Sequence, residues 1–471
     1  MKKITKVIAA ATALSAALGV CAYAAEDTIE DKVIAGYQAW FNTEGDGSPR
    51  NEWVHWGRPE VGHLTFDAYP DVRDYSVEDL KETYFAELGN GEKSKLFSSY
   101  RAGVIDKHFE MMHDYGIDGV AVQRFGSVTI NGVEERFKNS VDILKNVKAS
   151  AEKHNELFYV MYDISGLSEE NLVEDLKADW QQVILNDLDI TSSPSYAKDN
   201  GRPVVCLWGL GIREGTGEQY SELIDWFHDK GCYVIGGVSK SWRDQIAKDE
   251  AMEKAFCKLD MLSPWSVGSA KTDSDVDSDA SILAADKAYL DEKGIAYQPV
   301  MFPGFSWSNW KDNAVRNQIP RRAGDFMWRQ AYNIAKQDIH CGYIAMFDEY
   351  DEGTAILKLA EDSSMIPKDQ YFITASADGS YTSSDLYMRL AGYIPKVLRG
   401  EEEITEEMPL LLSEGPVYFR SGFEKYFDAQ PVDGNGELVK DELTYNGRYA
   451  LKLNRVGGGG EMLTKLSELD F

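Results

Sequence analysis

The segment Gly342-Tyr343-Ile344-Ala345-Met346-Phe347 is an almost unbroken apolar run, and four acids in five positions follow it at once, in Asp348-Glu349-Tyr350-Asp351-Glu352. A strand that is apolar at every position is typical of a parallel sheet, because helices cover both of its faces and neither meets water. The run therefore predicts a central strand of an α/β fold. The acids that follow it would be costly to bury unless they faced a polar cavity.

Further apolar runs precede this one, and amphipathic stretches separate them. In 102–115 the residues Ile105, Phe109 and Met112 fall on one helical face, and Gly116 fits a C-cap; 324–336 repeats this spacing, and 383–399 is the last predicted helix. The predicted strands are 33–40, 119–125, 158–164, 203–208, 232–238, 261–267, 297–302 and 342–348. Eight β/α units in about 375 residues predict an α/β protein of the (β/α)8 TIM-barrel class. An open doubly wound sheet is the alternative, and its nucleotide-binding form is weakened because neither GxGxxG nor a Walker loop follows the first strand.

The two ends of the chain differ from this pattern. Residues 1–24 predict a signal peptide, with a basic start, the apolar run 7–20 and the cleavage site Ala22-Tyr23-Ala24, so we expect a secreted protein. Cys21 raises lipidation as an alternative, against which Val20 argues. The barrel is expected over 25–400, and 401–415 is expected to be an acidic linker. Residues 416–471 predict a short β-rich C-terminal segment, or an incomplete module, with strands at 417–419, 443–445 and 449–453 and a turn at 446–447.

Composition excludes several classes of function. The net charge of −29 opposes binding to nucleic acid and to anionic lipid, and no second long apolar stretch predicts a membrane span. The cysteines of the mature chain are far apart and are expected in the core rather than in disulfides: Cys206, Cys232, Cys257 and Cys341. Neither CxxC nor HExxH is present, so no metal and no cofactor are predicted. The acids of 273–277 resemble half of a calcium loop, but Ser278 and Ala284 replace its glycine and its closing glutamate, which favours a solvated loop before a helix.

Aromatic residues gather where the predicted strands end. All tryptophans except Trp180, Trp226 and Trp328 lie there or just beyond, and barrel enzymes place their active sites at this end. Flat aromatic faces stack on sugar rings, so we expect a carbohydrate cleft; aromatics that only cap the barrel core are the alternative. Candidate substrate-binding residues are Tyr37, Trp40, His55, Trp56, Arg124, Asp163, Trp208, Trp242, Trp265, Trp307 and Asp351. A structural salt bridge is an equal alternative for Arg124 and Asp163, as is a core role for Tyr37 and His55.

The acids after the last predicted strand are the candidate catalytic groups. Crowded carboxylates push their pKa values apart, so that one stays protonated while another is ionised, which glycosidic cleavage requires. Gly353 would permit a tight turn that brings Glu349 and Glu352 together. A charged surface loop that begins a helix is the alternative.

The order Glu349-x-x-Glu352-Gly353-Thr354 resembles the motif of glycoside hydrolase family 99, the endo-α-mannosidases, and of the wider 71/99-like group. The resemblance covers about residues 30–400. It extends to 66–71, 116–125, 160–163, 203–209 and 302–307.

This resemblance implies a (β/α)8 barrel that cleaves α-mannosides with retention. It implies that Glu349 removes the proton from the sugar's own 2-hydroxyl, which gives an anhydro-sugar intermediate, and that Glu352 is the general acid and then the general base. The family has Trp-His between its glutamates, where this chain has Tyr350-Asp351. This difference from the family affects the prediction of the sugar more than it affects the prediction of hydrolysis.

The sequence therefore predicts a secreted hydrolase of α-mannosidic linkages, with an oligosaccharide or polysaccharide as its substrate. A barrel of the same group that acts on xylosides or arabinosides is one alternative. A carbohydrate-binding barrel without catalysis is another. No oligomeric state is assigned.

Overall fold

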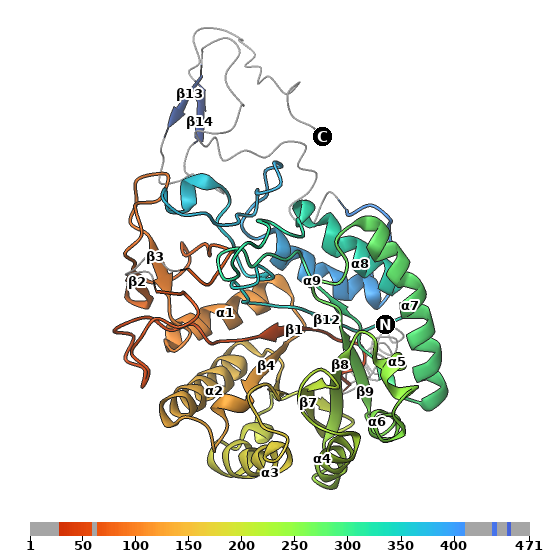
Figure 1. Cartoon of the computed structure of the whole chain (residues 1–471). Helices are drawn as coiled ribbons and strands as arrows, with labels where there is room; N and C mark the ends of the chain where they lie inside the picture. The colour runs from red at the N-terminus through yellow and green to blue at the C-terminus, as the bar shows by residue number, and fades with distance from the viewer. Residues whose placement is uncertain (1–27, 59–63, 410–435, 440–449, 454–471) are drawn as a thin grey trace, which may run out of the picture.

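The barrel is the centre of the computed structural model, which describes residues 28–58, 64–409, 436–439 and 450–453 (Figure 1). Its strands are each parallel to their neighbours, and several are buried along their whole length. In barrel order they are β1 (Val33–Tyr37), β4 (Val120–Phe125), β5 (Phe158–Asp163), β7 (Arg202–Leu210), β8 (Tyr233–Ser239), β9 (Met261–Trp265), β10 (Ala296–Tyr297) with β11 (Val300–Met301), and β12 (Gly342–Ile344).

The barrel closes through a strand that is interrupted once. β10 pairs with β9, β11 pairs with β12, and only Gln298 and Pro299 lie between β10 and β11. Gln298 N donates to Leu262 O at 3.0 Å, and Tyr343 N donates to Pro299 O at 2.9 Å, so the interruption still bridges both neighbours. Since β12 also pairs with β1, every predicted strand is found and the TIM-barrel prediction is confirmed.

Helices surround the strands on the outside (Figure 1). They are α1 (Ala102–Tyr115), α2 (Glu134–His154), α3 (Leu172–Asp179), α4 (Gly217–Asp229), α5 (Trp242–Ile246), α6 (Glu250–Phe256), α7 (Asp273–Lys293), α8 (Asp325–Ala335) and α9 (Leu386–Leu398). The prediction for α1 is confirmed to the residue. Gly116 ends this helix at φ 71°, where its N–H donates to the carbonyls of Met112 and His113.

The acidic segment 273–277 is not the loop that we expected. It forms the first turn of α7, because Thr272 accepts a hydrogen bond from Asp275 N while the Asp275 side chain accepts one from Thr272 N. This reciprocal arrangement is a capping box, and acidic residues in a first turn also suit the helix dipole.

Two smaller hairpins lie outside the barrel. β2 (Leu80–Glu82) pairs antiparallel with β3 (Lys95–Phe97), and β13 (Gly436–Val439) pairs antiparallel with β14 (Ala450–Leu453). β14 falls in the predicted strand 449–453, whereas the predictions for 1–24, 417–419 and 443–447 lie outside the described residues. The linker and module boundaries stay predictions.

The cysteines largely follow the prediction. Cys206, Cys232 and Cys341 are buried and free, whereas Cys257 is free but exposed. Within the described ranges, no helix is both long and apolar enough for a bilayer span.

Candidate active site

The acidic stretch after β12 forms a tight, buried turn at the barrel mouth. Asp348, Glu349 and Asp351 are exposed by only 0%, 4% and 7%, and no helix begins at this turn, so the surface-loop alternative is wrong. The turn closes because the N–H groups of Thr354 and Ala355 donate to Glu349 O at 3.0 and 2.8 Å. Both glutamates are thereby carried on one turn at the end of the last barrel strand.

Glu349 is held by donors on both carboxylate oxygens. Its Oε1 accepts from Asp351 N at 2.8 Å and from Glu352 N at 3.2 Å, and its Oε2 accepts from Gln38 Nε2 at 3.0 Å. Asp348 in turn accepts from Gln38 N at 2.7 Å and from Ala39 N at 2.8 Å. These bonds join the end of β1 to the acidic turn and fix the Glu349 carboxylate before any substrate arrives.

The acids of this turn raise one another's pKa. Burial is the main cause that raises the pKa of Glu349, and the charges of Asp351, Glu352 and Asp348 add to it. Burial also raises the pKa of Asp351, to which Glu352, Asp67 and Asp348 contribute. Such crowding favours partial protonation of the group, so that acid and base forms exist side by side.

Glu352 differs from Glu349 because its side chain is half-buried and lies near cations. Burial raises the pKa of Glu352, while Lys311 and Arg213 oppose that rise. Its backbone carbonyl accepts from Ser306 N at 2.9 Å, which ties the turn to the loop after β11. A partly exposed carboxyl with a raised pKa suits a proton donor.

One layer of the barrel brings the predicted residues Asp163 and Trp208 together. Phe125, Asp163, Trp208 and Gly237 are successive register partners across β4, β5, β7 and β8. Register partners on adjacent strands share a face. Arg124, the neighbour of Phe125, points outward to α3, so this layer faces the lumen.

The Trp208 ring extends this layer toward β9. A Cβ on Gly237 would lie 2.6 Å from Trp208 Cδ1, so the glycine makes room for the ring. Trp208 meets the predicted Trp265 edge-to-face at 5.2 Å, and the Arg213 guanidinium lies 5.6 Å from the Trp208 ring centre. The same arginine opposes the rise in the Glu352 pKa, which links this aromatic wall to the acidic turn.

A second aromatic group contains the predicted residues Trp40 and His55. The His55 ring is stacked on Trp40 at 3.7 Å and 7°, and Trp40 is stacked on Phe125 at 5.3 Å and 17°. His55 Nδ1 lies 2.6 Å from Asp351 Oδ2. The stack therefore joins the loop after β1 and the end of β4 to the acidic turn.

The predicted Trp307 lies on the loop after β11, which Asp67 holds. Asp67 accepts hydrogen bonds from Ser306 Oγ at 2.7 Å, from Ser308 N at 2.8 Å and from Asn309 N at 2.7 Å. No role was assigned to Asp67 from the sequence, because its partners are more than 230 residues away along the chain. Its place in the stretch 66–71 of the family resemblance was the available signal.

Tyr37 and Trp56 are in the core rather than at a cleft. Both are fully buried; Tyr37 OH lies 2.9 Å from His108 Nδ1, and Trp56 Nε1 donates to Phe97 O at 2.9 Å. The expectation that they touch substrate is not supported, and the core alternative fits Tyr37.

Arg124 and Trp242 are also placed away from the mouth. The Arg124 guanidinium is fully buried and donates to both oxygens of Asp179, at 2.6 and 2.7 Å, outside the barrel wall. Trp242 is 1% exposed and packs edge-to-face on Tyr289 of α7 at 5.3 Å. Arg124 thus forms the structural salt bridge that was its alternative.

Buried polar atoms without a partner occur in several parts of the described chain. Such atoms are rare unless water or a ligand satisfies them, and five of them belong to residues of the barrel strands or of the segments that follow these strands. They are Gln38 Oε1, Trp40 Nε1, Gln123 Oε1, Trp208 Nε1 and Asp351 Oδ1. Donors and acceptors are both present, as a hydroxyl-rich ligand requires.

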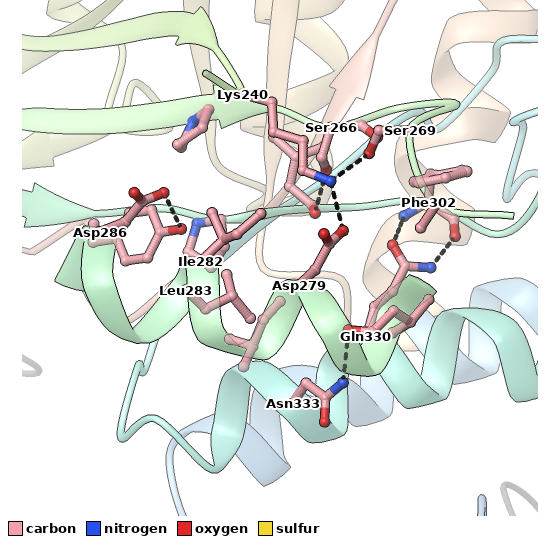
Figure 2. Close-up of a pocket in the computed structure, with 17 residues that line it drawn as sticks. Lys240, Ser266, Ser269, Asp279, Ile282, Leu283, Asp286, Phe302, Gln330 and Asn333 are labelled. Carbon is pink, nitrogen blue, oxygen red and sulfur yellow. Dashed lines mark hydrogen bonds and ion pairs between the residues drawn. The ribbon is translucent and has the colours of Figure 1, made fainter. Parts of the chain in front are cut away.

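A cavity of about 60 Å³ between α7, α8 and the barrel wall provides a contrast (Figure 2). Its polar groups are satisfied within the protein: Lys240 Nζ donates to Asp279 and Ser269 at 2.6 and 2.9 Å, and Gln330 bridges the backbone of Phe302. The mouth, unlike this cavity, offers polar atoms that still need partners.

The described side chains form no group of three or more His, Cys, Asp or Glu that could hold a metal ion. At the mouth the carboxylates of Asp348 and Glu349 accept from N–H donors instead.

Comparison with known proteins gives the fold. No protein-family model and no curated protein sequence matches the chain. Among solved structures, the GH99 endo-α-mannosidase from Bacteroides thetaiotaomicron in complex with BIS-TRIS-propane matches with a TM-score of 0.58 and 15% identity, over 79% of this chain and 99% of that one. A further structure of the GH99 endo-α-mannosidase from the same organism matches over the same shares, with a TM-score of 0.58 and 14% identity. The chain therefore has a glycoside hydrolase-like TIM-barrel fold.

Proposed function

We propose that this protein is a secreted, retaining glycoside hydrolase that cleaves α-mannosidic linkages in oligosaccharides or polysaccharides. The observation that carries the proposal is the turn with Glu349 and Glu352, one carboxylate fixed by three donors and the other half-buried near two cations. The aromatic side chains and unpartnered polar atoms around it suit a sugar. The likeness in fold to the endo-α-mannosidases supports the substrate class.

In the proposed reaction Glu349 is the base and Glu352 is the acid. Glu349 takes the proton of the sugar 2-hydroxyl, whose oxygen attacks the anomeric carbon, while Glu352 protonates the departing glycosidic oxygen. Glu352 then takes a proton from water, the water oxygen opens the anhydro-sugar at the anomeric carbon, and Glu349 returns its proton to the 2-oxygen. Lys311 and Arg213 favour the Glu352 carboxylate that remains once its proton has been given up. The three N–H donors to Glu349 favour the ionised form that the base requires.

Replacement of Glu352 tests the assignment. We expect Glu352→Gln to lower kcat/KM on α-mannan and α-mannosyl oligosaccharides by about 10²- to 10⁴-fold, the usual contribution of a general acid. The loss should be smaller on aryl α-mannosides with a good leaving group, which needs no protonation. Glu156→Gln is the control: this carboxyl is also buried with a raised pKa, but it precedes β5 at the opposite end of the barrel.

Three other outcomes would contradict part or all of the proposed function. Unchanged turnover by Glu352→Gln would reject the proposal. Cleavage of xylosides or arabinosides in place of mannosides would keep the hydrolase and change the sugar. Binding by the wild type without turnover, unaffected by Glu349→Gln, would indicate a carbohydrate-binding barrel.

A further inference from the structure

We propose that His55 is a third substrate-contacting residue, whose Nε2 hydrogen-bonds a hydroxyl of the sugar, and that Asp351 is the positioning residue that holds its ring. This inference rests on the proposed function and adds to the glutamate pair. It starts from the 2.6 Å contact between His55 Nδ1 and Asp351 Oδ2, which joins the loop after β1 to the acidic turn.

The His55 ring is held on several sides. Trp40 stacks on one face at 3.7 Å and 7°, and Phe41 meets the ring at 74° with centres 5.9 Å apart. The backbone of His55 lies in the left-handed region at φ 63°, and its carbonyl accepts from Thr65 Oγ1 at 2.6 Å. A non-glycine residue is uncommon in that region, and such positions concentrate at functional sites. The ring is thus fixed in orientation before a ligand binds.

Among the described residues, Nε2 is the His55 nitrogen without a hydrogen-bond partner. The His55 side chain is 30% exposed, and Nε2 makes no hydrogen bond within the described residues and is not among their buried unpartnered atoms. Since Nδ1 is engaged by Asp351, Nε2 is the ring nitrogen that we assign to the ligand. The tautomer of an imidazole is set by the bond that its other nitrogen makes, so Asp351 decides how Nε2 is presented.

Burial, with a smaller contribution from a nearby cation, favours the neutral imidazole. Burial lowers the pKa of His55 to about 3, and Arg50 on the same loop contributes. Burial raises the pKa of Asp351, and the charges of Glu352, Asp67 and Asp348 add to that rise. A neutral imidazole offers either a lone pair or an N–H at Nε2, and both suit a sugar hydroxyl.

The His55–Asp351 pair contains a buried polar atom without a partner. Asp351 Oδ1 is buried and has no partner, and Trp40 Nε1 below the His55 ring is in the same condition. Both atoms belong to side chains that contact His55, so polar partners are missing within this group of residues. A water or a hydroxyl that reached these atoms would supply those partners, whereas an apolar group would not.

Two substitutions at one position separate the proposed role from a structural one. In His55→Asn the amide nitrogen takes the place of Nδ1, so the Asp351 contact is kept and the outward nitrogen is lost. In His55→Gln the amide nitrogen takes the place of Nε2, so the outward group is kept and the Asp351 contact is lost. Both variants, the wild type and Glu352→Gln are assayed for kcat and KM on an aryl α-mannoside and for Tm.

We expect His55→Asn to keep the wild-type Tm and to lose about tenfold in kcat/KM, as the loss of one substrate hydrogen bond costs. His55→Gln should keep more of kcat/KM and lose Tm, because Asp351 is left unpaired. Wild-type kcat/KM in His55→Asn, or parallel losses of Tm and kcat/KM in both variants, would overturn the inference alone. If the wild type does not cleave the mannoside, or Glu352→Gln is unaffected, the proposed function fails and this contact fails with it.

Discussion

Gly353 is the residue that allows Glu352 to reach the barrel mouth. It adopts φ 62°, where a side chain is strained, and an added Cβ would lie 3.3 Å from Ser306 O. We expect Gly353→Ala to lower the free energy of unfolding by about 1–2 kcal/mol from the left-handed backbone and to lower kcat further, because Ser306 also bonds the Glu352 carbonyl. Urea denaturation and steady-state kinetics measure the two effects.

Gly116→Ala is the matched control. Gly116 has a similar φ of 71°, but an added Cβ would meet nothing within 4 Å, and it lies at the end of α1 rather than at the mouth. It should lose similar stability and keep its kcat. Equal kcat in both variants would show that the turn does not depend on Gly353.

Side-chain direction is where reasoning from the sequence was weakest at the residue scale. Tyr37 and Arg124 were chosen, but they face the helices, and their neighbours Gln38 and Phe125 face the lumen. Neighbours on a strand point to opposite faces, so a shift of one residue inverts the assignment. The hydrophobic pattern could not decide between them, since a strand buried on both faces shows no alternation. Asp163 lies in the lumen layer as expected.

The loop after β11 is the element that joins the acidic turn to the aromatic side chains. Asp67 fixes it with bonds to Ser306, Ser308 and Asn309, and Ser306 N donates to Glu352 O. We expect Asp67→Asn to raise KM for an α-mannosyl oligosaccharide about tenfold, because an amide offers one acceptor oxygen where these donors need two. The kinetic split between KM and kcat is the measurement.

Asp71→Asn provides a control on the same segment. The Asp71 carboxylate is buried and binds Arg73 at 2.6 Å, away from the β11 loop. This variant should lose stability without a change in KM. If KM rose equally in both variants, the rise in Asp67→Asn would be due to general destabilisation of residues 66–71 and not to the lost bonds of the β11 loop.

Element positions were more predictable than side-chain directions. Apolar runs located all the barrel strands, and helical spacing with a following glycine located α1. The interruption between β10 and β11 was not predicted, because it depends on pairing to two different neighbours on either side of Gln298 and Pro299. The start of α7 was missed because the reciprocal bonds of Thr272 and Asp275 were not considered for an acidic run.

The excess of acidic over basic residues affects the stability of the whole molecule. At a net charge of −29 the folded chain repels itself increasingly as pH rises. Burial raises the pKa of Asp348 from 3.8 to about 7 and that of Glu156 from 4.5 to about 7. Other carboxyls, such as Asp46 and Asp385, have lowered pKa values owing to hydrogen bonds and to Arg389. The two sets act on stability in different pH windows.

We expect the protein to be more stable near pH 5 than at pH 8. Between pH 4 and 7 the folded state binds more protons than the unfolded chain at Asp348 and Glu156, so the free energy of unfolding falls as pH rises, by up to about 1.4 kcal/mol per pKa unit and group. Asp46 and Asp385 lose their contribution only as pH falls below about 4, because their folded pKa values are depressed. Differential scanning calorimetry at constant ionic strength should show Tm higher by a few degrees at pH 5, and Glu156→Gln should flatten that dependence without changing turnover. A Tm that is higher at pH 8 would mean that the buried acids are ionised at little cost, which would also remove the support that burial gives to Glu352 as the proton donor.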